Sequence, residues 1–257
     1  MRAKERLVTA LDGGIPDRLP VTTHHLMSYF LDHVMGGMDN DAFFAHFGLD
    51  PIRWINPYRA DALAEEMLDP LREDPLAPCP LLTPQWRLER EVLREDAPRT
   101  VRYRFVTPGG ALTMTTESNV YTTWLTEHLI KEKRDIDLLG EYLPAPKCDV
   151  QAVNREAVRY GQDALIRGSI AAFDIFGQAG CWQDAACLVG IQRLIVETYD
   201  DPLWVHALLS ILQARKKVHT ASLAGAAFDV LELGGGDASS TVISPRLFDR
   251  FVAPYDQ

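Results

Sequence analysis

Residues 228–255 read FDVLELGGGDASSTVISPRLFDRFVAPY, and this stretch says most about the fold. Residues 228–233 predict a buried strand, and the glycines at 234–236 predict a turn directly after it. Ser244 is a favourable N-cap, and Pro245 suits the first helical position because its missing N–H needs no partner there. The stretch therefore predicts a strand, a turn, a polar loop and a helix, in that order.

The same alternation of strands and helices recurs along the chain. Apolar strand patterns precede amphipathic helical patterns, and the helices are long enough to carry the chain back across a sheet. The predicted strands are residues 18–22, 51–55 and 164–170, and the clearest predicted helices are residues 1–12, 186–199 and 202–224. Strands separated by long helices indicate βα units and a parallel sheet.

Residues 101–118 (VRYRFVTPGGALTMTTES) have a different pattern. Two runs of alternating polar and apolar residues flank the Thr-Pro-Gly-Gly sequence at 107–110, which predicts an antiparallel hairpin with a longer turn. We interpret this segment as an antiparallel excursion from an otherwise α/β scaffold.

Composition excludes several classes of function. The 257 residues carry a net charge of −10, which disfavours nucleic acid and anionic membrane as partners. No apolar run reaches the 18 residues or so that span a bilayer, and the charged, amphipathic start does not resemble a secretion signal. Cys79, Cys148, Cys181 and Cys187 are scattered without paired spacing, so reduced thiols and a cytoplasmic location are the simplest expectation.

Three stretches together resemble the uroporphyrinogen decarboxylase superfamily. They are RLVTALDGGIPDRLPV at 6–21, RGSIAAFDIFGQAGCWQD at 167–184 and ELGGGDASSTVISPRLFDRFVAPY at 232–255. The resemblance covers nearly the whole chain, and it implies one TIM-type (β/α)8 barrel domain over residues 1–257. It also implies a small-molecule site at the carboxyl ends of the strands.

One departure from this family concerns the arginines that hold the porphyrin carboxylates. True decarboxylases have an arginine-rich Met-Arg-Gln-Ala-Gly-Arg segment after the first strand, whereas residues 23–35 here read THHLMSYFLDHVM and contain no arginine. Guanidinium is the best bidentate partner of a carboxylate. The sequence therefore favours the superfamily's other branch, methyltransferases that move a methyl group between a corrinoid protein (a methylcobamide) and a thiol or related acceptor.

A second departure concerns zinc. The resemblance implies a zinc enzyme whose His-x-Cys and later Cys ligands follow the Pro-Tyr helix, but this sequence stops at Gln257, directly after that helix. The cysteines that are present do not match the motif. We therefore expect an incomplete barrel, truncated before its last strands, with the zinc ligands encoded beyond codon 257 and the corrinoid carried by a partner protein.

The candidate catalytic residues follow predicted strands. His24 and His25 come after the first strand, Asp174 after residues 164–170, and Glu232 and Asp237 bracket the glycine turn. Histidine and carboxylate side chains at strand ends can move protons or orient a substrate. Helix capping and loop turns are the alternative roles for these residues, and only one of the adjacent histidines can face the site.

Gln178 and Trp182 are candidate substrate-binding residues of the same site, although Trp182 also suits simple packing. Three functions remain open at this point. The chain resembles a corrinoid-dependent methyltransferase most, a uroporphyrinogen decarboxylase of tetrapyrrole biosynthesis next, and a binding protein or inactive fragment last. The nucleotide sequence after codon 257 would separate the first from the last.

Overall fold

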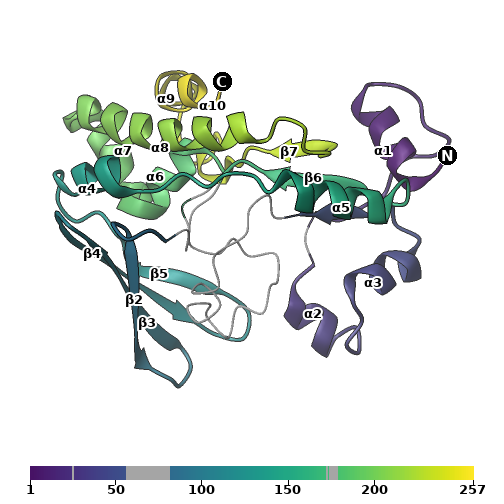
Figure 1. Cartoon of the computed structure of the whole chain (residues 1–257), viewed down its shortest axis with the longest axis horizontal. Coiled ribbons are helices and arrows are strands. Elements are labelled where there is room, and N and C mark those ends of the chain that lie inside the picture. Colours follow the sequence, from purple (N-terminus) through teal and green to yellow (C-terminus); the bar gives the residue numbers. More distant parts are fainter. Residues whose placement is uncertain (25, 56–81, 172, 174–178) are drawn as a thin grey trace.

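The structure is a computed structural model that describes residues 1–24, 26–55, 82–171, 173 and 179–257. Its described strands form two separate sheets (Figure 1). A three-stranded parallel sheet has the order β1-β6-β7, and a four-stranded antiparallel sheet has the order β2-β3-β4-β5. The parallel strands are β1 (Ile52–Trp54), β6 (Leu165–Ser169) and β7 (Val230–Glu232), and the antiparallel strands are β2 (Arg87–Arg94), β3 (Arg99–Thr107), β4 (Gly110–Ser118) and β5 (Thr123–Glu127).

Helices cover both sheets. In Figure 1, α4, α6, α7 and α8 lie on the same side of the molecule as the antiparallel sheet, whereas α1, α2 and α3 lie at the opposite end. The helices are α1 (Ala3–Leu11), α2 (Ser28–His33), α3 (Asn40–Phe47), α4 (Asp135–Tyr142), α5 (Val150–Tyr160), α6 (Cys181–Val189), α7 (Ile191–Asp200), α8 (Pro202–Ser222), α9 (Pro245–Phe251) and α10 (Ala253–Asp256).

The expected (β/α)8 barrel, even an incomplete one, is wrong. A barrel needs one helix after each strand, but α6, α7 and α8 follow one another with no strand between them. Residues 87–127 pair in sequence order instead, because short connections let each alternating strand fold back on the one before it. Among the described strands, only β6 has a parallel neighbour on both sides.

Several local expectations are confirmed. The hairpin is present as β3 and β4, which close at the pair Thr107 and Gly110, but it belongs to a four-stranded sheet. Strands β1, β6 and β7 lie where the sequence predicted them. Residues 18–22 are not a strand. The helix predicted at 186–199 is interrupted at Gly190, whose φ of 91° lies in the left-handed region that glycine adopts at low cost.

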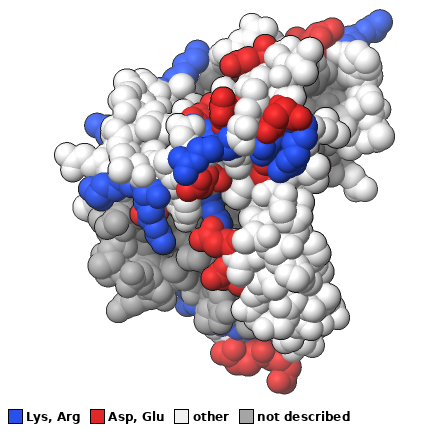
Figure 2. Space-filling view, turned by 90° about the vertical axis from the view of Figure 1, so that its right-hand side faces the viewer, with Lys and Arg blue, Asp and Glu red and all other residues white. Residues whose placement is uncertain are grey.

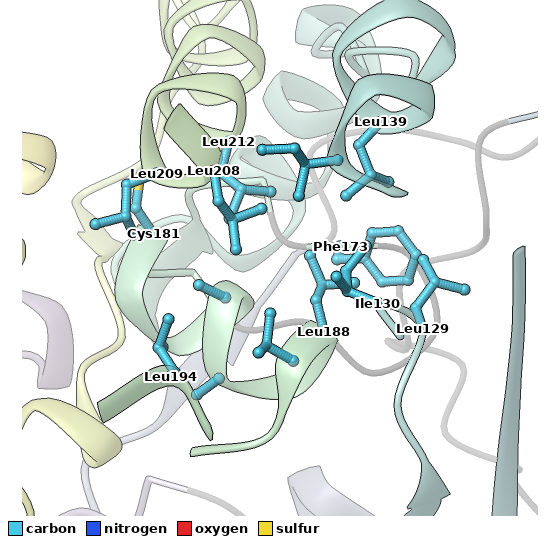
Figure 3. Packing of buried hydrophobic residues seen from close by; sticks show 14 of the residues in the cluster. Leu129, Ile130, Leu139, Phe173, Cys181, Leu188, Leu194, Leu208, Leu209 and Leu212 are labelled. Carbon is cyan, nitrogen blue, oxygen red and sulfur yellow. The ribbon is translucent and has the colours of Figure 1, made fainter. Parts of the chain in front are cut away.

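The main core lies between the antiparallel sheet and the helices. The rings of Trp86 and Phe105 pack with centroids 5.0 Å apart and a tilt of 33°, and the centroids of Phe105 and Phe173 are 5.6 Å apart. Figure 3 shows Phe173 beside Leu188 of α6, with leucines of α8 above them. A much smaller cluster of Ile55, Val153 and Ile166 lies at the parallel sheet. The apolar core therefore belongs chiefly to the antiparallel half of the molecule.

The Pro-Asp-Arg-x-Pro motif near the N-terminus has a structural role. Arg6 of α1 donates from Nε to Asp17 at 2.6 Å and from Nη1 to Asp50 at 2.5 Å, and Arg18 Nη2 contacts Asp50 at 2.9 Å. The Arg6 guanidinium lowers the pKa of the Asp17 carboxyl well below its usual range, mainly through their hydrogen bond. Figure 2, which views the end of the molecule that carries α1, shows acidic and basic side chains lying side by side. These ion pairs tie α1 to the segment that enters β1.

Candidate functional site

The parallel sheet brings the ends of β1, β6 and β7 next to one another. Trp54 is the register partner of Arg167, and Ser169 is the register partner of Glu232. Because register partners point to the same face of a sheet, Trp54 and Arg167 share one face. His24, which lies 208 positions from Glu232 in sequence, reaches the same place. We call His24, Trp54, Arg167 and Glu232 the strand-end cluster.

Arg167 is the centre of the strand-end cluster. Its side chain is only 8% exposed, and its guanidinium carbon lies 4.3 Å from the centroid of the Trp54 ring. Nη2 donates to Glu232 Oε2 and also to His24 Nε2, at 2.5 Å. A planar guanidinium that stacks on an indole and pairs with a carboxylate is held in one orientation.

His24 is the accessible member of the cluster. Its side chain is 62% exposed, its ring meets the edge of Trp54 at a centroid distance of 6.1 Å, and Nε2 lies 3.4 Å from Glu232 Oε1. Arginine can only donate, so His24 Nε2 must accept from Arg167, which places the imidazole proton on Nδ1. If Nε2 takes up a proton, it becomes a donor that faces Glu232. The arrangement can therefore accept a proton once Arg167 releases Nε2, and Glu232 then stabilises the charge that results.

Close backbone packing positions β7 against the start of α6. A Cβ on Gly180 would lie 2.2 Å from the carbonyl oxygen of Gly234, so a side chain has no room there. A Cβ on Gly168 would collide with the ring of Phe228 at 2.6 Å. Gly180 and Gly168 thus let chain segments approach each other, whereas a Cβ on a glycine of the 234–236 turn would meet no atom closer than 3.4 Å.

Asp237 and Trp182 contact each other away from the guanidinium. The Trp182 indole donates to the backbone oxygen of Asp237 at 3.2 Å, and the Asp237 amide donates to Gln183 Oε1 at 3.3 Å. The structure places Trp182 in the main core, where it is 1% exposed and its ring centroid lies 6.4 Å from that of Phe251. These contacts support a packing role for Trp182 and use the main chain of Asp237.

Three of the predicted site residues, His25, Asp174 and Gln178, lie outside the described residues. Their grouping with Glu232 and Asp237 stays a prediction. Of the remaining candidates, the structure brings His24 and Glu232 together. Sequence reasoning missed Arg167 and Trp54. A single charged residue within the apolar strand ALIRGSI was the available signal, because a buried arginine needs a partner.

A buried ion pair supports the segment that leaves β6. Lys216 Nζ of α8 donates to Asp184 Oδ2 of α6 and to the carbonyl oxygen of Ala171, each at 2.5 Å. Asp184 Oδ1 accepts the Phe173 amide at 2.9 Å. The side chains of Lys216 and Asp184 are 6% and 1% exposed. This pair fixes the backbone just past the strand-end cluster, and no local sequence pattern predicts it.

The described cysteines do not suggest thiol chemistry. Burial raises the pKa of Cys181 and of Cys187 to about 12, so both are neutral near pH 7. Within the described ranges, no group of three or more His, Cys, Asp or Glu side chains is arranged to hold a metal ion. These residues therefore do not fit the zinc site that the family resemblance implies.

Comparison of the chain with protein-family models, curated proteins and solved structures finds no match. In the part of the chain that the structure describes, no helix has both the length and the apolar character needed to cross a membrane.

Proposed function

We propose that the strand-end cluster is the substrate site of a methyltransferase that moves a methyl group between a corrinoid protein and a thiol or related acceptor. One observation carries the proposal, namely that Arg167 Nη2 contacts both Glu232 and His24 Nε2 at the strand ends. A proton acceptor thus lies beside a fixed cation. The three stretches that resemble the uroporphyrinogen decarboxylase superfamily support the choice of methyl transfer.

Each member of the cluster has a role in this reaction. When bound, the corrinoid of a partner protein would supply the methyl group and would keep the electron pair of the bond that breaks. His24 Nε2 takes the proton that the thiol sulfur gives up as sulfur bonds to the methyl carbon. Arg167 stabilises the negative charge that develops on sulfur, and Glu232 and Trp54 hold the guanidinium in place. Glu232 then pairs with the protonated His24.

Turnover of the full-length gene product tests the proposal. Methylcobalamin and 2-mercaptoethanol are the probes, and mass spectrometry detects the methyl thioether. We expect His24→Gln to lower kcat by roughly 10²-fold, as loss of a general base does, because glutamine cannot take up the proton. His46→Gln is the matched control, since His46 is an exposed histidine on α3 and should leave kcat unchanged.

Two results would overturn the proposal. One is CO2 release from uroporphyrinogen with no methyl transfer from any methylcobamide. The other is equal turnover by the His24→Gln and His46→Gln proteins, which would remove His24 from the reaction.

Uroporphyrinogen decarboxylation is the second candidate, and Arg167 is the observation that favours it. Residues 23–35 contain no arginine, but β6 supplies one to the site from a different part of the chain. Guanidinium is the natural partner of a substrate carboxylate. We rank this reaction second because Glu232 already neutralises Arg167, whereas the tetrapyrrole carries many carboxylates. The CO2 assay above separates the two reactions.

A further inference from the structure

Arg167 has hydrogen-bonding capacity that its protein contacts do not use. A guanidinium carries five N–H groups, and both protein acceptors of Arg167 bind to Nη2. Within residues 1–24, 26–55, 82–171, 173 and 179–257, the structure gives Nε and Nη1 no acceptor. A cation that is more than nine-tenths buried is costly unless its donors are satisfied. This cation is therefore suited to a ligand.

Arg53 on the neighbouring strand is also buried, but in a different environment. Its Nε and Nη2 likewise have no hydrogen-bond partner among the described residues, whereas its guanidinium lies between the rings of Phe44, at 5.7 Å, and Tyr160, at 5.2 Å, and beside Asp41. Because it precedes Trp54 on β1, it points to the opposite face of the sheet. Aromatic rings cover Arg53 on two sides, whereas among the described residues only the Trp54 ring stacks on Arg167.

The contact between Arg167 and His24 also restrains the proposed base. While Nη2 donates to His24 Nε2, the lone pair on that nitrogen is occupied and cannot take a thiol proton. Another acceptor must replace His24 before His24 can act. A carboxylate oxygen is a stronger acceptor of a guanidinium N–H than an imidazole nitrogen is.

We propose that the methyl acceptor carries a carboxylate, and that this carboxylate takes the place of His24 on Arg167. One oxygen accepts the Nη2–H that His24 releases, and the other accepts the adjacent N–H of Nε or Nη1, which completes a bidentate pair. His24 Nε2 is then available to the thiol. This inference rests on the proposed methyl transfer, because it assigns the substrate class of the same site.

The charges balance through the proposed exchange. Before binding, Arg167 and Glu232 neutralise each other. The ligand carboxylate adds one negative charge, and His24 adds one positive charge when it accepts the thiol proton. Glu232 Oε1, which is 3.4 Å from His24 Nε2, then accepts a hydrogen bond from the protonated His24. The ligand carboxylate meanwhile pairs with the Arg167 guanidinium. No uncompensated charge remains in the site.

Two matched thiols test the inference on the full-length gene product. 3-Mercaptopropionate and 3-mercapto-1-propanol have the same chain length and differ in the carboxylate. With methylcobalamin as methyl donor, we expect kcat/KM to favour the carboxylate by roughly tenfold or more, the value of one good charged pair. Arg167→Lys should abolish this preference, because lysine lacks the planar fork. Arg104→Lys, on the solvent face of the other sheet, should keep it.

A binding measurement separates this inference from the proposed function. Calorimetry with 3-(methylthio)propionate needs no turnover, and the Arg167→Lys protein is compared with Arg104→Lys after thermal melting shows that both are folded. If the wild type binds this probe through Arg167 but transfers no methyl group, the carboxylate site is supported and the proposed methyl transfer is refuted. If both thiols are methylated equally and the probe does not bind, methyl transfer stands and the carboxylate site is refuted. If Arg167→Lys does not fold, the wild-type preference between the two thiols decides the matter alone.

Discussion

The two sheets of this protein differ in what they bury. The antiparallel sheet has strands of 8, 9, 9 and 5 residues, and its inner face contributes Val101, Phe105 and Met114, each at most 1% exposed, to the main core. The parallel sheet has strands of 3, 5 and 3 residues and buries two arginines, Arg53 and Arg167, whereas the longer antiparallel sheet buries Arg99 at the start of β3. Apolar burial stabilises a fold, whereas buried charge has to be compensated. The comparison assigns stability to the antiparallel sheet and chemistry to the parallel one.

The largest expected effect comes from removing an aromatic side chain from the antiparallel sheet. Phe105 is fully buried between Trp86 and Phe173, so Phe105→Ala leaves a large cavity. We expect the free energy of unfolding to fall by about 3–5 kcal/mol, measured by urea denaturation. A loss below about 1 kcal/mol, well under that range, would show that this sheet is not the stabilising part of the molecule.

A smaller effect is expected from acid on the last strand of the same sheet. Burial raises the pKa of Glu127, but hydrogen bonds from Thr115, Lys131 and Thr113 outweigh it and hold the pKa at about 2. Since the folded pKa lies below the ordinary value of 4.5, the ionised carboxylate stabilises the fold at and above pH 4.5. That contribution is lost as the pH falls from 4.5 towards 2.

Glu127→Gln should remove this part of the acid dependence. The effect is moderate because the Glu127 side chain is 36% exposed and water screens its interactions. Thermal melting of both proteins between pH 5 and pH 2.5 measures it. Parallel curves for wild type and variant would contradict the assignment.

The smallest effect is expected on the solvent face of the antiparallel sheet. Arg104 and Glu89 pair across β3 and β2 at 2.6 Å, but their side chains are 49% and 50% exposed. A double-mutant cycle of Arg104→Ala and Glu89→Ala should give a coupling energy of about 0.2–1 kcal/mol that weakens in high salt. A coupling well above this range would mean that exposed charges also stabilise this sheet.

Sequence reasoning succeeded where the signal was local. The hairpin at 107–110 followed from alternation, and the N-cap at Ser244 is confirmed by its 3.3 Å hydrogen bond from the Leu247 amide. It failed on how the strands are divided between sheets. Residues 87–127 pair with their neighbours in sequence, but no local pattern says that they form a sheet separate from the parallel strands, because that separation depends on long-range packing.

The site could be predicted only in part, because its residues come from segments that are far apart in the sequence. His24 and Glu232 could be chosen because each follows a predicted strand, and the structure joins them. Arg167 escaped notice because it lies within an apolar strand whose pattern predicts core. The role of Arg167 depends on its contacts with Trp54 and His24, which lie 113 and 143 positions earlier in the sequence. No local pattern connects these residues to Arg167.

Mapping of backbone amide shifts by NMR tests most directly whether the parallel sheet carries the chemistry. The full-length gene product is titrated with 3-mercaptopropionate, and each amide is followed in the ¹⁵N–¹H spectrum. We expect the largest shifts at Trp54, Gly168 and Glu232, at the ends of the parallel strands, and none at Phe105 or Met114 of the antiparallel sheet. Shifts confined to β3 and β4, with β6 and β7 unchanged, would contradict the account.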